Sequence, residues 1–109
     1  MAAELKVELL WWEGCPSWER ALARLREAMS ELGLDPAAVE VREVDTDQAA
    51  AREEFVGSPT IRVNGEDVQP PGPDQAAGLT CRIYRGRDGS ISPLPDPDDL
   101  RDALAAARV

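Results

Sequence analysis

The chain has 109 residues, with 43% hydrophobic and 30% charged side chains, which is enough for one folded domain around one hydrophobic core. Its formal net charge of −9 repels a phosphate backbone, so we expect no nucleic-acid partner. It has no histidine, which excludes Cys–His catalysis and zinc sites built from cysteine and histidine.

Apolar runs and cysteine content bear on the location of the protein. No apolar run approaches the ~20 residues of a membrane-spanning helix, so we expect no membrane partner. The first residues lack a basic region followed by an apolar stretch, so we expect no secretory signal and a cytoplasmic protein. Cytosolic thiols stay reduced unless they take part in redox chemistry, which directs attention to the two cysteines, Cys15 and Cys81.

The first strand and the first helix are predicted from periodicity. Residues 5–11 alternate apolar and polar side chains and then become fully apolar, as a strand that enters a core does. Pro16 suits the first position of a helix, where the N–H that it lacks would be unpaired, and Gly33 ends that helix. The apolar residues between them recur every three or four positions and share one face: Trp18, Leu22, Leu25, Met29 and Leu32.

The middle of the chain predicts two further strands around a short helix. Residues 39–44 alternate in the manner of a second strand. Asp45 or Thr46 can cap a helix that ends at Gly57. Residues 60–63 then form the third strand.

A hairpin and a loop follow the third strand. The dipeptide Asn-Gly at 64–65 is a strong hairpin signal, because both residues tolerate positive φ in a type I′ turn. Residues 67–69 should therefore return antiparallel as a fourth strand. Residues 70–78 begin with a proline-rich run that breaks regular structure, which predicts a loop.

The last part of the chain predicts a second hairpin and a closing helix. Residues 79–84 and 90–92 form the hairpin strands, and Asp96 caps a helix whose first position is a proline. The inward stripe of this helix consists of Leu100, Leu104 and Ala107. The order β-α-β-α-β-β, hairpin, helix predicts a mixed sheet with helices on both faces, in a single α/β domain over 1–109.

Two segments resemble the thioredoxin-like superfamily, which includes thioredoxins and glutaredoxins. Residues 11–18 read Trp-Trp-Glu-Gly-Cys-Pro-Ser-Trp at a strand-to-helix junction, where that family has its Cys-x-x-Cys active site. Residues 57–61 read Gly-Ser-Pro-Thr-Ile and are similar to the family's cis-proline motif before the third strand. The resemblance covers roughly residues 4–69 and the last helix. It implies a three-layer α/β/α fold with a mixed four-stranded sheet, to which the hairpin near Cys81 is an addition.

Cys15 is the candidate nucleophile of this motif. The first turn of a helix offers unpaired N–H groups and the positive end of the helix dipole. A thiolate placed there is stabilised, and the thiolate is the form that attacks disulfides and binds soft metals. The alternative interpretation of Cys15 is a small buried apolar side chain that precedes a helix.

Trp18 stands where the family has its second active-site cysteine, so dithiol exchange within the motif is excluded. Three alternatives remain: Cys15 acts alone with a small thiol such as glutathione or mycothiol, Cys81 acts as a distant resolving cysteine, or catalysis has been lost. Residues 70–78 leave from the Cys15 end of the predicted sheet and could bring Cys81 back to it. A disulfide needs Cα atoms within about 7 Å of each other. A buried structural Cys81 in a strand is the equal alternative.

The resemblance also implies a groove for a peptide or a small thiol. In the family the proline packs beside the active cysteine, and the residue before it pairs with substrate backbone, which assigns these places to Pro59 and Ser58. One of the tryptophans at 11–12 points outward, since strand neighbours face opposite sides, and would form an apolar lip with Trp18. The candidate substrate-binding residues are Trp12, Pro16, Trp18, Ser58 and Pro59. Three arginines either bind a carboxylate or phosphate or form a solvated strand face: Arg82, Arg85 and Arg87.

These features lead to three functional hypotheses. The first is a monomeric thiol–disulfide oxidoreductase without a cofactor, in which Cys15 exchanges with a disulfide-bearing protein or a low-molecular-weight thiol and Cys81 or an external thiol resolves the mixed disulfide. The second is capture of a soft metal or organometal (mercury, copper(I) or arsenite), for which two thiolates suffice. The third is a thioredoxin-like interaction module that kept the fold and lost the chemistry.

Overall fold

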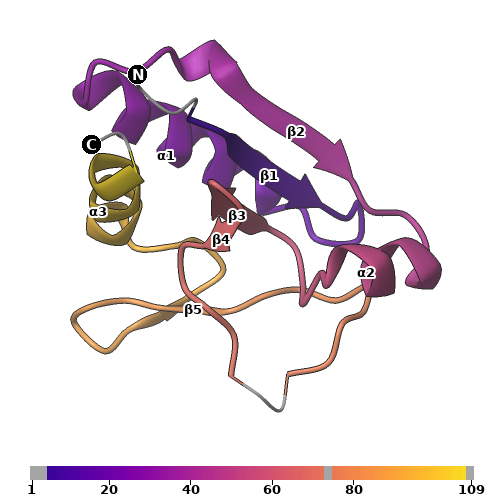
Figure 1. The fold of residues 1–109 in the computed structure, drawn as a ribbon. Helices are drawn as coiled ribbons and strands as arrows, with labels where there is room; N and C mark the ends of the chain where they lie inside the picture. Colours follow the sequence, from indigo (N-terminus) through magenta and orange to yellow (C-terminus); the bar gives the residue numbers. More distant parts are fainter. Residues whose placement is uncertain (1–4, 73–74, 108–109) are drawn as a thin grey trace.

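One mixed sheet of four strands forms the centre of the computed structural model of the chain, in the order β2-β1-β3-β4 (Figure 1). The structure describes residues 5–72 and 75–107. The strands of this sheet are β1 (Val7–Trp11), β2 (Val39–Glu43), β3 (Thr60–Val63) and β4 (Glu66–Asp67). β1 pairs in parallel with β2, and β3 pairs antiparallel with β4, as predicted; β1 also pairs antiparallel with β3.

Three α-helices cover the two faces of this sheet within the part of the chain that the structure describes. They are α1 (Trp18–Glu31), α2 (Asp47–Glu53) and α3 (Pro97–Ala107). Leu9 of β1 belongs to a buried cluster with residues of α1 and α3, whereas the adjacent Leu10 belongs to a second cluster with Ala50 of α2 and Phe55. Because neighbouring strand residues face opposite sides, the helices lie on both faces of the sheet. None of these helices combines the length and apolar character needed to span a bilayer.

Two helix ends differ from the prediction. The first helix begins at Trp18, with Ser17 as the residue before it, and not at Pro16. The Cys15 N–H donates to the carbonyl of Trp12 (3.1 Å), which closes a turn that keeps Pro16 outside the helix. The second helix has its predicted cap, since Thr46 Oγ1 accepts the Ala49 N–H at 3.0 Å. It ends at Glu53 and not at Gly57, because Glu54 takes up a left-handed conformation with φ 55°.

The Asn-Gly hairpin is confirmed. Asn64 and Gly65 have φ values of 52° and 83°, and only residues that tolerate positive φ suit such a turn. The fourth strand covers two residues directly after the turn, so it starts and ends earlier than predicted. Asn64 Oδ1 also accepts the Lys6 N–H at 2.8 Å, which ties the hairpin to the chain just before β1.

The second hairpin is shorter than predicted and does not extend the main sheet. It consists of β5 (Tyr84–Arg85) and β6 (Ile91–Ser92), which pair antiparallel as a separate sheet. The remainder of the predicted strand 79–84 makes a single parallel bridge, between Cys81 and Ser58. The closing helix begins at Pro97 as predicted, and Asp96 Oδ1 accepts the Asp98 N–H at 2.8 Å.

Candidate functional site

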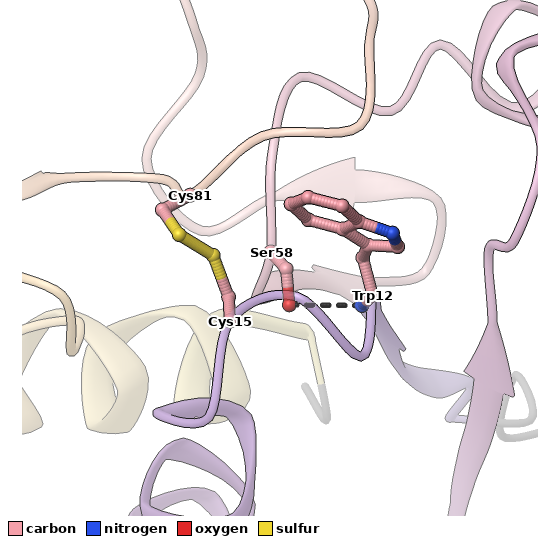
Figure 2. Close-up of a disulfide and its surroundings, with 4 residues drawn as sticks. All are labelled: Trp12, Cys15, Ser58 and Cys81. Carbon is pink, nitrogen blue, oxygen red and sulfur yellow. Dashed lines mark hydrogen bonds between the residues drawn. A yellow bond between two sulfur atoms is a disulfide. The ribbon is translucent and has the colours of Figure 1, made fainter.

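The two cysteines form a disulfide. Their Cα atoms lie 5.6 Å apart although 66 residues separate them in the sequence. Cys15 comes from the turn between β1 and α1, and Cys81 comes from the segment between β4 and β5 (Figure 2). The structure thus brings together the two candidate catalytic residues, and it selects the paired arrangement for Cys81 over an isolated structural cysteine.

Strand order explains how these distant residues meet. Leu10 near the end of β1 is opposite Thr60 at the start of β3. The turn that carries Cys15 and the bend that carries Ser58 therefore lie at the same ends of these two strands. The antiparallel β4 brings the chain back toward these strand ends. The segment that carries Cys81, residues 75–85, then runs beside Ser58, and we call it the Cys81 segment.

Ser58 is the residue to which the Cys81 segment is joined by backbone hydrogen bonds. Its N–H donates to the carbonyl of Thr80 at 2.8 Å, and its carbonyl accepts the Arg82 N–H at 2.9 Å. Its hydroxyl accepts the Trp12 N–H at 3.0 Å (Figure 2). The backbone groups that the resemblance assigns to a substrate peptide are therefore already paired with the chain's own residues in this oxidised form.

Pro59 completes the bend beside the disulfide. The Ser58–Pro59 peptide bond is cis, as the resemblance implied, and both residues are buried. The hydroxyl of Tyr84, which lies in β5, donates to the carbonyl of Pro59. Burial raises the pKa of Tyr84, so the hydroxyl stays protonated and can make this bond. Neither the sequence motif nor the resemblance pointed to Tyr84.

The side chain of Arg82 fixes the Cys81 segment to the rest of the protein. Its guanidinium is 4% exposed and donates two hydrogen bonds to the Asp67 carboxylate, at 2.6 and 2.8 Å. It also donates to the carbonyl of Gln69 and stacks over the Tyr84 ring, 4.4 Å from its centroid. Burial alone would lower the pKa of Arg82, but the bonds to Asp67 outweigh it and raise that pKa, so Arg82 is charged.

Arg82 therefore does not belong to a solvated strand face. Arg85 and Arg87 are exposed, which agrees with that expectation for them. Arg87 forms ion pairs with Asp99 and Asp102 of α3 and so ties the β5–β6 hairpin to that helix. The sequence held no signal for the buried pair, because Arg82 and Asp67 lie 15 residues apart on two different segments.

The tryptophans do not form one lip. Trp11 stacks on Trp18, with ring centroids 4.2 Å apart and planes inclined by 16°. Trp12 packs instead against the cluster of α2 and Phe55 on the other face of the sheet. A Cβ atom at Gly14 would lie 2.4 Å from the Trp12 ring, so the ring covers the turn that leads to Cys15. Trp12 and Trp18 thus flank the turn from different sides, and the neighbouring Pro16 is exposed.

A pocket lies close in sequence to one half of the disulfide. The pocket, of about 690 Å³, lies between residues 69–72 and the β5–β6 hairpin, and includes Arg82 and Ile83, which directly follow Cys81. Ile83 and Ile91 on its wall are 67% and 68% exposed, so this surface places apolar side chains beside polar ones such as Gln69 and Arg85. Within residues 5–72 and 75–107, no three cysteine, histidine or carboxylate side chains gather in a way that could hold a metal ion.

The two cysteines of the disulfide differ in their exposure to solvent. Cys15 is 0% exposed, whereas Cys81 is exposed, as is Thr80 before it. The site as a whole consists of a buried cysteine, an exposed cysteine and a cis-proline bend that holds the segment of the exposed cysteine in place. Comparison of this chain with protein-family models, with curated proteins and with solved structures finds no match.

Proposed function

We propose that this protein is a thioredoxin-like thiol–disulfide exchange protein whose redox-active group is the Cys15–Cys81 disulfide. The observation that carries the proposal is the meeting of the two cysteines beside the cis Ser58–Pro59 bond, at the turn between β1 and α1. Its partners would be disulfide-bearing proteins or low-molecular-weight thiols of the cytoplasm. There, a disulfide that serves only structure would be out of place.

The arrangement of elements supports the proposal. A parallel β1–β2 pair, the antiparallel β3 and β4, and helices on both faces agree with the fold that the resemblance implies. Trp18 removes the usual second cysteine, and Cys81 supplies a second sulfur from another part of the chain. The protein can therefore exchange two electrons: two thiols reduce its disulfide to two cysteines and leave as one disulfide.

The reduction potential of the disulfide tests this proposal. The oxidised protein is equilibrated with mixtures of reduced and oxidised glutathione, quenched with acid, and alkylated to count free thiols. We expect a midpoint above about −270 mV, the range of exchange proteins, whereas a purely structural disulfide lies below about −300 mV. In a turnover assay on a disulfide-bonded test protein, Cys15→Ser and Cys81→Ser should both abolish activity. Ser17→Ala, in the same turn, should leave it unchanged.

A second candidate is soft-metal capture by the reduced pair. It is favoured by the same 5.6 Å separation of Cα atoms, which suits two thiolates around one linearly coordinated ion. Titration of the reduced protein with mercury(II), followed by thiolate-to-metal absorbance, would show one equivalent bound. If the binding strength were the same in Cys81→Ser, paired coordination would be ruled out.

A further inference from the structure

We infer that external thiols react at Cys81 and that Cys15 is the resolving cysteine, which reverses the roles assigned from the sequence. The inference rests on the proposed exchange function. It is carried by exposure: no part of Cys15 reaches solvent, whereas Cys81 is exposed. An attacking thiolate must reach the sulfur with which it bonds, so access decides which cysteine forms the mixed disulfide.

The burial of Cys15 has identifiable causes. Its N–H is bonded to the Trp12 carbonyl within a tight turn, and the ring of Trp12 packs over Gly14 just before it. The Cys81 segment covers the opposite side and is held there by the two backbone bonds of Ser58. These bonds hold the Cys81 segment beside Cys15 in the oxidised protein, where Cys15 is 0% exposed.

Cys81 has the opposite surroundings. Thr80 before it is exposed, and Ile83 beyond it is 67% exposed, while the buried Arg82 between them points into the protein and pairs with Asp67. The ion pair fixes the segment in an orientation that keeps Cys81 at the surface. The pocket of about 690 Å³ includes Arg82 and Ile83, the two residues that directly follow Cys81 in the chain.

The reaction balances with two equivalents of a low-molecular-weight thiol. The first thiolate bonds to the Cys81 sulfur, the Cys15–Cys81 bond breaks, and Cys15 leaves as a thiolate that takes a proton from solvent. A second thiolate then attacks the sulfur of the bound small thiol. It forms the small-molecule disulfide and releases Cys81 as a thiolate. In the reverse direction, Cys81 attacks the small-molecule disulfide, and Cys15 resolves the mixed disulfide by attack on Cys81.

The site of the first attack can be read by mass spectrometry on the wild-type protein. Oxidised protein is mixed with glutathione, quenched early with acid, alkylated with N-ethylmaleimide and digested with trypsin. The cleavage sites place the two cysteines in separate peptides, residues 7–20 and residues 63–82. We expect glutathione on the peptide of Cys81 and the alkyl group on the peptide of Cys15, with an excess of about tenfold or more over the opposite pattern.

Each other outcome has a distinct meaning. Glutathione on Cys15, or equal amounts on both cysteines, overturns this inference and leaves the exchange function standing. An intact disulfide at glutathione concentrations that reduce exchange proteins overturns both. The three patterns are distinguishable in one digest, since each yields different peptide masses.

Single-cysteine variants provide an independent measurement. Cys15→Ser leaves Cys81, and Cys81→Ser leaves Cys15, and each is reacted with the chromogenic disulfide 5,5′-dithiobis(2-nitrobenzoate). We expect Cys81 to react at least about tenfold faster in the folded proteins, because it is an exposed residue and Cys15 is a fully buried one. Both variants should react at similar rates in denaturant, which controls for sequence context. Equal rates in the folded proteins would contradict the inference.

Discussion

At the scale of single residues, the buried Arg82 holds the Cys81 segment in place more firmly than the exposed residues beside it. A buried guanidinium that lacks a partner is strongly unfavourable, and here Asp67 supplies both oxygens of a carboxylate that is itself only 12% exposed. The pair joins the Cys81 segment to β4. Because Arg82 also donates its backbone N–H to Ser58, one residue fixes the segment on two sides.

Arg82→Met should destabilise the oxidised protein by about 3 to 5 kcal/mol, because it leaves the Asp67 carboxylate buried without its partner. The double variant Arg82→Met, Asp67→Leu should recover much of that loss, since no unpaired charge remains. Urea unfolding at constant pH measures both. Arg85→Met, at an exposed position of the same hairpin, serves as the control and should stay within about 0.5 kcal/mol of wild type. A small effect of Arg82→Met would show that the pair does not stabilise the fold.

At the scale of elements, local signals in the sequence predicted most of the fold. Strand alternation, the Thr46 cap, the Asn-Gly turn and Pro97 at the start of α3 all act through neighbouring residues, so a short window of sequence contains them. The start of α1 was predicted wrongly, because the turn closed by Cys15 and Trp12 outweighs the preference of Pro16 for a first helical position.

The rest of the candidate site depends on long-range pairing, which no local pattern encodes. Residues 79–83 read as a strand, yet the segment finds only one bridge partner, at Ser58. The backbone groups of Ser58 are filled by the chain itself, and the contact of Tyr84 with Pro59 spans 25 residues. The sequence could identify Cys15, Cys81 and the Ser58-Pro59 bend as candidates. It could not decide whether the fold brings Cys81 close to the other two.

The N-terminal cap of α3 predicts a pH effect. The Asp96 carboxylate accepts the N–H groups of Arg87 (3.0 Å) and Asp98 (2.8 Å), and these bonds lower the pKa of Asp96 below its ordinary value of 3.8. The stabilisation that they provide is therefore complete above the ordinary value and is lost as pH falls through the lowered one.

Asp96→Asn tests this effect, because the amide oxygen still accepts a hydrogen bond but does not titrate. We expect the variant to be less stable than wild type at neutral pH, and the difference in free energy of unfolding to be constant at neutral and mildly acidic pH and to shrink only as pH falls below the ordinary pKa of 3.8. Unfolding by urea from neutral pH to below that value measures it. If the difference in free energy of unfolding between wild type and Asp96→Asn stayed constant with pH, the charge of Asp96 would not contribute to the stability of the cap.

At the scale of the whole molecule, the disulfide lies outside the two largest groups of packed apolar side chains, although Cys15 itself is fully buried. The two buried clusters unite the sheet with its helices, and neither includes Cys15 or Cys81. Reduction should therefore leave the fold intact while it removes a constraint across 66 residues of chain. The chain-entropy model gives a loss of about 4 kcal/mol for a loop of this length.

Urea unfolding of the oxidised and reduced wild-type protein measures that loss, with the double variant Cys15→Ser, Cys81→Ser as a reference that no oxidant can alter. The reduced protein and the double variant should unfold cooperatively with similar midpoints. If reduction instead abolished cooperative unfolding, the disulfide would be a requirement of the fold, and an exchange role that demands a stable reduced form would be untenable.

The reduced protein also tests how far contacts other than the disulfide keep the Cys81 segment attached to the sheet. Without the disulfide, the Arg82–Asp67 pair and the Ser58 backbone bonds still attach residues 75–85 to the sheet edge. We therefore expect amide hydrogen exchange in this segment to rise modestly on reduction of wild type and far more on reduction of Arg82→Met, with β1 unchanged in both. Because Cys81 must stay close to Cys15 for the disulfide to re-form, the ion pair would then also determine how fast the reduced protein is reoxidised. Full release of the segment by reduction alone would mean that the disulfide is its only effective attachment.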